Sequence, residues 1–325
     1  MHKVIQEFLN NGFTQEEVFK IIKIRRSKKA FAKIDVSNRI QGYISFFQKY
    51  HKSKSEIIKK LRKTPRLFCC TPEFIERNFL SMSSFFEISS EQCFKQIWNV
   101  PDLFAIPVDG IKKQIQNQAD VLKLPLDEWK KKAIKKPSVI KKSPHLLAKS
   151  LDTYVKELGI TKEEWIDVSL KAIELFSADP NTIISKVRVI AGIFCTDTHF
   201  LINSFSKFPS LMYADSKLMQ QKYDYLKKMY EDDLIKVDDD GIKHEAYLQE
   251  YLLKKPFILV YSLQALKLKR LYAIYIKKVK GVPQKMALYK TERAIIDELK
   301  NVPETFWEES QKSLLKSRIN HERSR

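Results

Sequence analysis

The stretch KKPSVIKKSPHLLAKSLDTYVKELGITKEEW, residues 135–165, contains the signals that decide the fold. Two prolines seven residues apart precede an apolar pattern typical of a helix, and Gly159 marks its end. A second helix is expected to begin at Thr161, because Glu164 stands three residues later and completes a capping-box pattern. The stretch therefore predicts two helices joined by a short turn, bounded by prolines.

The prolines recur at a fixed interval, which indicates a repeat. Pro65, Pro101 and Pro137 stand 36 residues apart, and Pro209 lies twice that interval beyond Pro137. Anchors at 29, 65, 101, 137, 173 and 209 define columns of equivalent positions. The column at offset 14 reads Tyr43, Phe79, Ile115, Leu151, Val187 and Tyr223. The column at offset 21 reads Tyr50, Phe86, Leu122, Leu158, Phe194 and Tyr230.

Two further columns are apolar as well. Offset 28 reads Ile57, Cys93, Trp129, Trp165 and Leu201. Offset 3 reads Ala32, Phe68, Phe104, Ile140, Phe176 and Met212. Because a stripe with this spacing is the buried face of an amphipathic helix, each repeat is predicted to hold two helices. Single repeats cannot bury both helices, so the prediction is an all-α helical-repeat superhelix (α-solenoid) of about 36-residue units.

The repeat varies along the chain. Residue 173 is Ile instead of Pro, and Pro256 follows Pro209 by 47 residues, which implies an insertion holding the acidic stretch YEDDLIKVDDDGIKHEAY. A second proline, as at Pro72, Pro144 and Pro180, suits the first turn of the next helix. We predict a repeat region over residues 1–281, with anchors near 29, 65, 101, 137, 173, 209 and 256, and a helical C-terminal cap or tail over residues 282–325.

Composition excludes several classes of protein. The 325 residues include seven glycines, and none of them forms a G-x-G or Walker-type phosphate loop. No stretch approaches the roughly 20 apolar residues of a membrane span. Four cysteines without a C-x-x-C pair suggest structural thiols in a reducing compartment, and no H-x-x-x-H pair or suitable carboxylate pair is present. The expectation is a protein that is not an enzyme, with no cofactor, no metal and no membrane partner.

A formal net charge of +20 indicates a polyanionic partner. The surplus lies at both ends: residues 1–150 carry +16, residues 151–250 carry −6 and residues 251–325 carry +10. A merely lysine-rich solvated surface is the alternative interpretation.

The repeats resemble those of the mitochondrial transcription termination factor (mTERF) family, which read P-x-Φ-L followed by helices ended by glycine. In the closing motif Pro256, Leu259, Tyr261, Ser262, Leu263 and Arg270 match in register, whereas Leu266 and Lys269 depart from the family's basic residue and proline. The resemblance covers about residues 29–281. It implies three-helix repeats with a basic concave face that binds nucleic acid, commonly double-stranded DNA, in transcription regulation or termination, ribosome assembly or RNA processing.

Cations cluster near the junction before each anchor, where equivalent positions of a solenoid share one edge. The candidate phosphate contacts are Arg25, Arg26, Lys59, Lys60, Arg62, Lys63, Lys112, Lys113, Lys131, Lys132, Lys135, Lys136, Lys267, Lys269 and Arg270. Lys171, Lys207 and Lys254 occupy the junction in later repeats. Each lysine alone is as well explained by the preference of helix C-terminal turns for cations. Because lysine dominates and base readout uses Arg, Asn or Gln, weak sequence preference is expected.

Two classes of function therefore stay open. The first is a monomeric nucleic-acid-binding solenoid, with duplex DNA favoured and structured RNA as the alternative. The second is a protein-interaction solenoid, including an effector that an intracellular bacterium secretes into its host. The bacterial cytoplasm is the favoured compartment. A location in mitochondria or plastids would mean that a presequence has been removed from the chain, and an effector would be secreted into the host.

Overall fold

A computed structural model describes residues 2–24, 35–232, 234, 245–280, 288, 291–299, 302–303 and 309–323. Within these ranges the regular structure is helical and no strand occurs. The all-α class predicted from the sequence is confirmed. The chain divides into two compact units, Met1–Ser150 (unit 1) and Leu151–Arg325 (unit 2), so that the boundary falls inside helix α10 (Pro144–Leu158).

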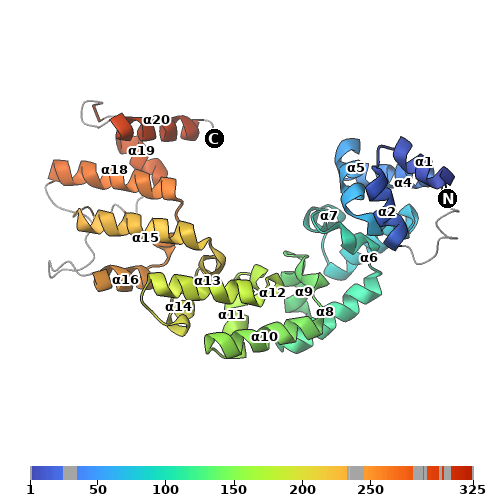
Figure 1. Cartoon of the computed structure of the whole chain (residues 1–325), viewed down its shortest axis with the longest axis horizontal. Coiled ribbons are helices and arrows are strands. Elements are labelled where there is room, and N and C mark those ends of the chain that lie inside the picture. Colours follow the sequence, from blue (N-terminus) through green and yellow to red (C-terminus); the bar gives the residue numbers. More distant parts are fainter. Residues whose placement is uncertain are drawn as a thin grey trace. The chain divides into compact units, whose positions relative to one another are not determined.

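Unit 1 is built from helices that follow the repeat (Figure 1). Its elements are α1 (His2–Asn10), α2 (Gln15–Ile24), α4 (Val36–Gln48), α5 (Lys54–Lys63), η1 (Pro65–Cys69), α6 (Pro72–Phe86), α7 (Ser90–Ile97), η2 (Pro101–Ala105), α8 (Val108–Leu122), α9 (Leu126–Ala133), η3 (Val139–Lys141) and the first half of α10. The longer helices α4, α6 and α8 pack in sequence, and each also packs against the shorter helix that follows it.

Unit 2 continues the same order after the second half of α10. Its elements are α11 (Lys162–Lys171), α12 (Glu174–Ser177), α13 (Pro180–Ile193), α14 (Thr198–Phe205), η4 (Pro209–Tyr213), α15 (Ser216–Glu231), α16 (Glu245–Lys254), α17 (Phe257–Val260), α18 (Leu263–Lys280), α19 (Glu292–Leu299) and α20 (Glu309–Arg323). Most of the acidic insertion, residues 233 and 235–244, lies outside the described residues.

Each repeat contains a long helix, a shorter helix and a very short third helix. The turn predicted after the anchor proline is this third element: Pro65, Pro101 and Pro209 begin the 3₁₀ helices η1, η2 and η4. Proline fits there because the first turn of a helix leaves its N–H groups unbonded in any case. The seven-residue spacing also holds, since Pro72, Pro144 and Pro180 begin α6, α10 and α13.

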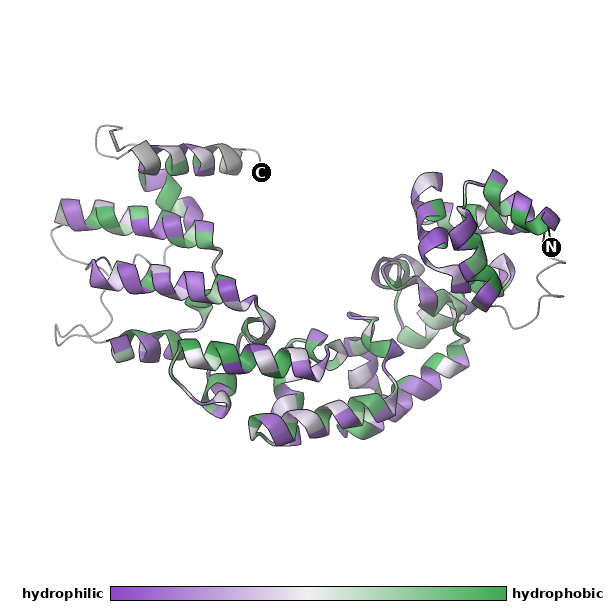
Figure 2. Ribbon diagram, in the orientation of Figure 1, coloured by the Kyte–Doolittle hydropathy of each residue, from purple (hydrophilic) through white to green (hydrophobic). Residues whose placement is uncertain are grey.

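The four apolar columns form the core. Every described member is buried except Tyr50, which is half-buried, and Ala32 lies outside the described residues. Figure 2 shows the result along the ribbon, where apolar and polar residues alternate around each long helix. Gly42 lies in α4 where this helix meets the start of α6. A Cβ at this position would lie 2.6 Å from Pro72 Cγ. The closest approach of α4 and α6 therefore requires glycine.

The column at offset 13, next to the apolar column at offset 14, is polar from its second member onward. It reads Gly42, Asn78, Gln114, Ser150, Lys186, Lys222 and, with Pro256 as anchor, Lys269. Asn78 Nδ2 donates to the carbonyls of Phe104 and Ile106, at 3.2 and 2.7 Å. Gln114 Nε2 donates in the same way to the carbonyls of Ile140 and Lys142.

The same contact recurs in unit 2 with lysine as the donor. Lys186 Nζ lies 2.8 Å from the carbonyl of Tyr213, and Lys222 Nζ lies 2.7 Å from that of Leu259. In α6, α8, α13 and α15 column 13 thus ties the long helix to carbonyl groups at the end of the next very short helix, where no intrahelical N–H reaches them. Ser150 differs, because its Oγ donates within α10.

Helix ends agree with the predicted signals. Thr161 and Glu164 form a capping box at the start of α11, and Ser89 and Gln92 form another at α7. Gly159 follows α10 with φ 68°, the left-handed conformation that glycine adopts without strain. The predicted division at residue 281 stays a prediction, although α19 and α20 pack against α18.

Trp165 tests the repeat core. Its side chain is fully buried, and its ring stacks on Tyr154 with the centroids 4.1 Å apart. We expect Trp165→Ala to lower the free energy of unfolding by about 3–5 kcal/mol, because the substitution leaves a large cavity. Denaturant titration measures this loss. Trp165→Phe, which keeps an aromatic ring, should cost clearly less, and equal stability of all three proteins would contradict the assignment.

Candidate nucleic-acid interface

The positive charge of the chain is concentrated in unit 1. Residues 1–150 carry a formal charge of +16, whereas residues 151–325 carry +4. A field of this strength attracts polyanions over distances beyond direct contact. Unit 1 therefore holds the stronger candidate surface for a polyanion.

Exposed lysines recur at two positions of the repeat in unit 1. Six residues before the anchors stand Lys59, Lys95 and Lys131, and two residues before them stand Lys63 and Lys135. All five side chains are exposed, and none forms an ion pair with another described residue. We call these five residues the lysine edge. At the second position Lys171, Lys207 and Lys254 are exposed in unit 2.

The lysine edge follows the ends of the shorter helices. Lys59 and Lys63 lie in α5, Lys95 lies in α7, Lys131 lies in α9, and Lys135 lies two residues after the end of α9. Cations near a helix C-terminus offset the partial negative charge of its free carbonyl groups. The same local preference thus places a cation at an equivalent point of each repeat in unit 1.

Two predicted contacts beside the edge are held by protein groups. Lys60 Nζ lies 4.9 Å from the centre of the Trp98 ring, and its pKa is lowered by burial first and then by the charges of Lys63 and Lys52. Arg62 is half-buried and contacts Glu17, the Phe13 ring and the carbonyl of Gly12. Arg62 therefore ties α5 to the segment between α1 and α2.

The other predicted residues of unit 1 differ in exposure. Lys112 and Lys113 are exposed near the start of α8, where Lys112 Nζ lies 3.4 Å from Asp109. Lys132 and Lys136 are half-buried. Arg25 and Arg26 lie outside the described residues.

In unit 2 the predicted site needs correction. Lys269 is fully buried, and its Nζ donates to the carbonyl of Leu288 at 2.9 Å. It occupies column 13, so it serves the interior and does not face a phosphate. Arg270 is half-buried, with Asp232 at 2.8 Å and the Tyr225 ring beside it. Lys267 is half-buried on the same helix.

Sequence reasoning missed Lys95 and the residues around Trp98. Lys95 could have been found, because it shares its column with Lys59 and Lys131. Lys52 and Trp98 could not, because they come from different repeats and meet only in the fold, where Lys52 Nζ lies 5.4 Å from the ring centre.

Metal chemistry has no candidate in the described part of the chain, where no three His, Cys, Asp or Glu side chains gather as a metal site requires. Among the described helices, none is long and apolar enough to cross a membrane.

The sequence was also compared with known proteins. The model of the mTERF family matches residues 36–237, which is more than half of the chain. No curated protein matches it significantly.

The buried Lys269 leads to a prediction about pH. Burial lowers the pKa of Lys269 from 10.5 to about 8. Between these values the unfolded chain holds the proton more tightly than the folded chain, so the stability of the fold rises with pH. The increment is on the order of 2–3 kcal/mol between pH 8 and 10.5.

The variant Lys269→Gln, which keeps a neutral donor, should lack this increment in thermal denaturation measured from pH 7 to 10.5. Lys267→Gln on the same helix is the matched control and should follow the unmodified protein. If the thermal stability of all three proteins changes with pH in the same way, the pKa of Lys269 is not lowered by burial.

Proposed function

The chain belongs to the mTERF family, and we propose that it is a nucleic-acid-binding helical-repeat protein whose lysine edge in unit 1 contacts phosphates. The supporting observation is the recurrence of exposed lysines at equivalent points of successive repeats. A second support is the +16 charge of unit 1.

Repetition matters because phosphates are themselves repeated along a nucleic acid. A protein that neutralises several phosphates at once releases their condensed counterions, and the gain in entropy drives binding. Exposed lysines that form no ion pair with a described residue can do this without first breaking such a contact. Lys112 and Lys113 extend the available cations on α8.

The proposed target is double-stranded DNA, and structured RNA is the alternative. Lysine contacts phosphates as a point charge and reads few base edges, so weak sequence preference is part of the proposal. The role that fits this binding is transcription regulation or termination, with RNA metabolism as the alternative, and it involves no catalysis by the chain itself.

A test of the lysine edge reverses three of its charges. We expect Lys63→Glu, Lys131→Glu and Lys135→Glu together to weaken binding of a blunt DNA duplex roughly 10- to 100-fold, because three attractive contacts become repulsive. Fluorescence anisotropy with a labelled duplex measures the affinity. The matched control reverses the exposed Lys156, Lys217 and Lys228 of unit 2, which changes the net charge equally.

If both triple variants bind the duplex equally well, net charge alone explains binding, and the assignment of phosphate contacts to the lysine edge is wrong. Circular dichroism verifies that the helices persist in both variants.

Salt dependence separates nucleic-acid binding from the alternative of a protein partner. The affinity of the unmodified protein for duplex DNA should fall steeply with salt, by about 0.9 log units per neutralised phosphate for each log unit of salt. The edge variant should show a slope smaller by about 3, one for each lost contact. A salt-independent affinity would contradict phosphate binding and favour a protein partner.

A further inference from the structure

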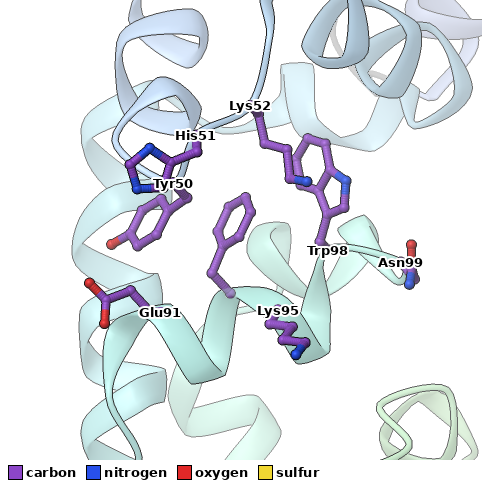
Figure 3. Close-up of a pocket in the computed structure, with 8 residues that line it drawn as sticks. Tyr50, His51, Lys52, Glu91, Lys95, Trp98 and Asn99 are labelled. Carbon is purple, nitrogen blue, oxygen red and sulfur yellow. The ribbon is translucent and has the colours of Figure 1, made fainter. Parts of the chain in front are cut away.

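A pocket of about 470 Å³ opens beside the lysine edge (Figure 3). Tyr50, His51 and Lys52 line it after α4, and α7 contributes Phe94 and Lys95 with Trp98 at its end. Its volume lies in the range of about 300–1,000 Å³ that is typical of small-molecule sites. Lys95 belongs to both the pocket and the lysine edge, so the two surfaces are continuous.

Aromatic rings form the apolar wall of this pocket. The rings of Tyr50 and Phe94 are stacked with centroids 4.4 Å apart and an interplanar angle of 7°. Phe94 in turn stacks on Trp98 at 5.1 Å. Phe94 is buried, whereas Tyr50 and Trp98 are half-buried and present part of their surface to the opening. Because Phe94 stacks on both neighbours, a flat aromatic ligand would contact the exposed parts of Tyr50 and Trp98 and gain from dispersion and contact area there.

Two cations lie over the indole of Trp98, and of these Lys52 lines the pocket, whereas Lys60 is not one of its lining residues. Lys52 Nζ and Lys60 Nζ lie 5.4 and 4.9 Å from the centre of the Trp98 ring. The ring attracts each ammonium group, but the two like charges repel one another. The nearest carboxylate to Lys52, that of Glu56, is 3.9 Å away. Glu91 also lines the pocket and is exposed. Glu56 forms an ion pair with Lys52 and offsets part of the repulsion, and a bound anion would add to this neutralisation.

The turn that carries Lys52 into the pocket is the one that ends the long helix of the repeat. His51 has φ 58°, in the left-handed region that non-glycine residues rarely adopt. This residue ends the turn after α4 and directs the next one, Lys52, toward Trp98 (Figure 3). Glu87, Lys123, Gly159 and Cys195 adopt the same conformation at the equivalent position of later repeats, so the turn at His51 belongs to the regular end of the long helix.

We propose that this pocket binds an unpaired nucleotide, with its base against Tyr50 and Trp98 and its phosphate at Lys52. The shared chemistry is an aromatic base joined to a phosphate, and it has two sources, a free mononucleotide or an unpaired end of a nucleic acid. Aromatic platforms beside basic grooves hold single strands in this way, since every base has a face for stacking. The inference rests on the proposed function for the second source only.

The test compares two DNA probes and a free nucleotide. A blunt duplex and the same duplex with a short single-stranded overhang are titrated by fluorescence anisotropy. The overhang should be bound about 5-fold or more tightly than the blunt end, because stacking adds to phosphate contact. Adenosine monophosphate is titrated separately by tryptophan fluorescence, with Trp98→Phe to assign the signal to Trp98.

Two variants carry the test of the pocket, and a third is the control. Trp98→Leu and Lys52→Gln should each remove the preference for the overhang. Lys52→Gln leaves the ring packing intact and so answers the question even if Trp98→Leu folds poorly. Phe85→Leu is the matched control, because Phe85 is a half-buried aromatic residue of unit 1 with Lys130 Nζ 5.6 Å from its ring centre. It should keep the preference.

The outcomes separate this inference from the proposed function. Equal binding of both duplexes, together with no response to adenosine monophosphate, overturns the pocket and leaves duplex binding standing. A preference that survives in Lys52→Gln also overturns it. If neither duplex binds but the nucleotide quenches Trp98, the proposed function fails and the pocket is supported with a free nucleotide as its ligand. If neither duplex binds and the nucleotide has no effect, both fail.

Discussion

The repeat depends on satisfying the carbonyl groups of its shortest helix. An element such as η2 bonds the carbonyl of Leu103 but leaves that of Phe104 without an intrahelical donor, and Phe104 is buried, where water cannot replace the missing donor. Column 13 supplies such donors from the preceding long helix, as Asn78 does for Phe104 and Ile106. An unsatisfied buried carbonyl costs about 1–3 kcal/mol, so a polar residue within an otherwise apolar face stabilises the stacking. Successive repeats are thus joined by directed hydrogen bonds as well as by apolar contact.

The sequence alone predicted the period, the apolar columns and most helix starts, because each depends on local rules or on burial at fixed spacing. Pro72 and Thr161 are clear examples, since the proline and the capping box act within one turn of their own helix. From the residue pattern the third helix of the repeat was predicted only as a turn, because a run of three to five residues has no periodicity to detect, and only the family resemblance implied three helices. Column 13 was not interpreted, although its polar residues at Asn78, Gln114 and Lys222 were visible in register.

The candidate interface was predictable in part. Lys63 and Lys135 were found because they precede an anchor, and the same rule would have found Lys95. Lys269 was misassigned because a sequence shows charge and not depth: only contact with Leu288 reveals that its ammonium group points inward. The pocket at Trp98 lies further beyond sequence reasoning, because it depends on the left-handed turn at His51 and on rings from two repeats.

Column 13 also affects how much of the net charge of the chain is exposed to solvent. Lys222 and Lys269 are buried, and they amount to half of the +4 surplus of unit 2. The solvent-facing surface of that unit is consequently close to electroneutral, while unit 1 keeps most of its excess at the surface. Long-range attraction acts on exposed charge, so a diffusing polyanion experiences a strongly uneven electric field. Under the proposed function, the first encounters of a polyanion with the chain would therefore occur mainly at unit 1.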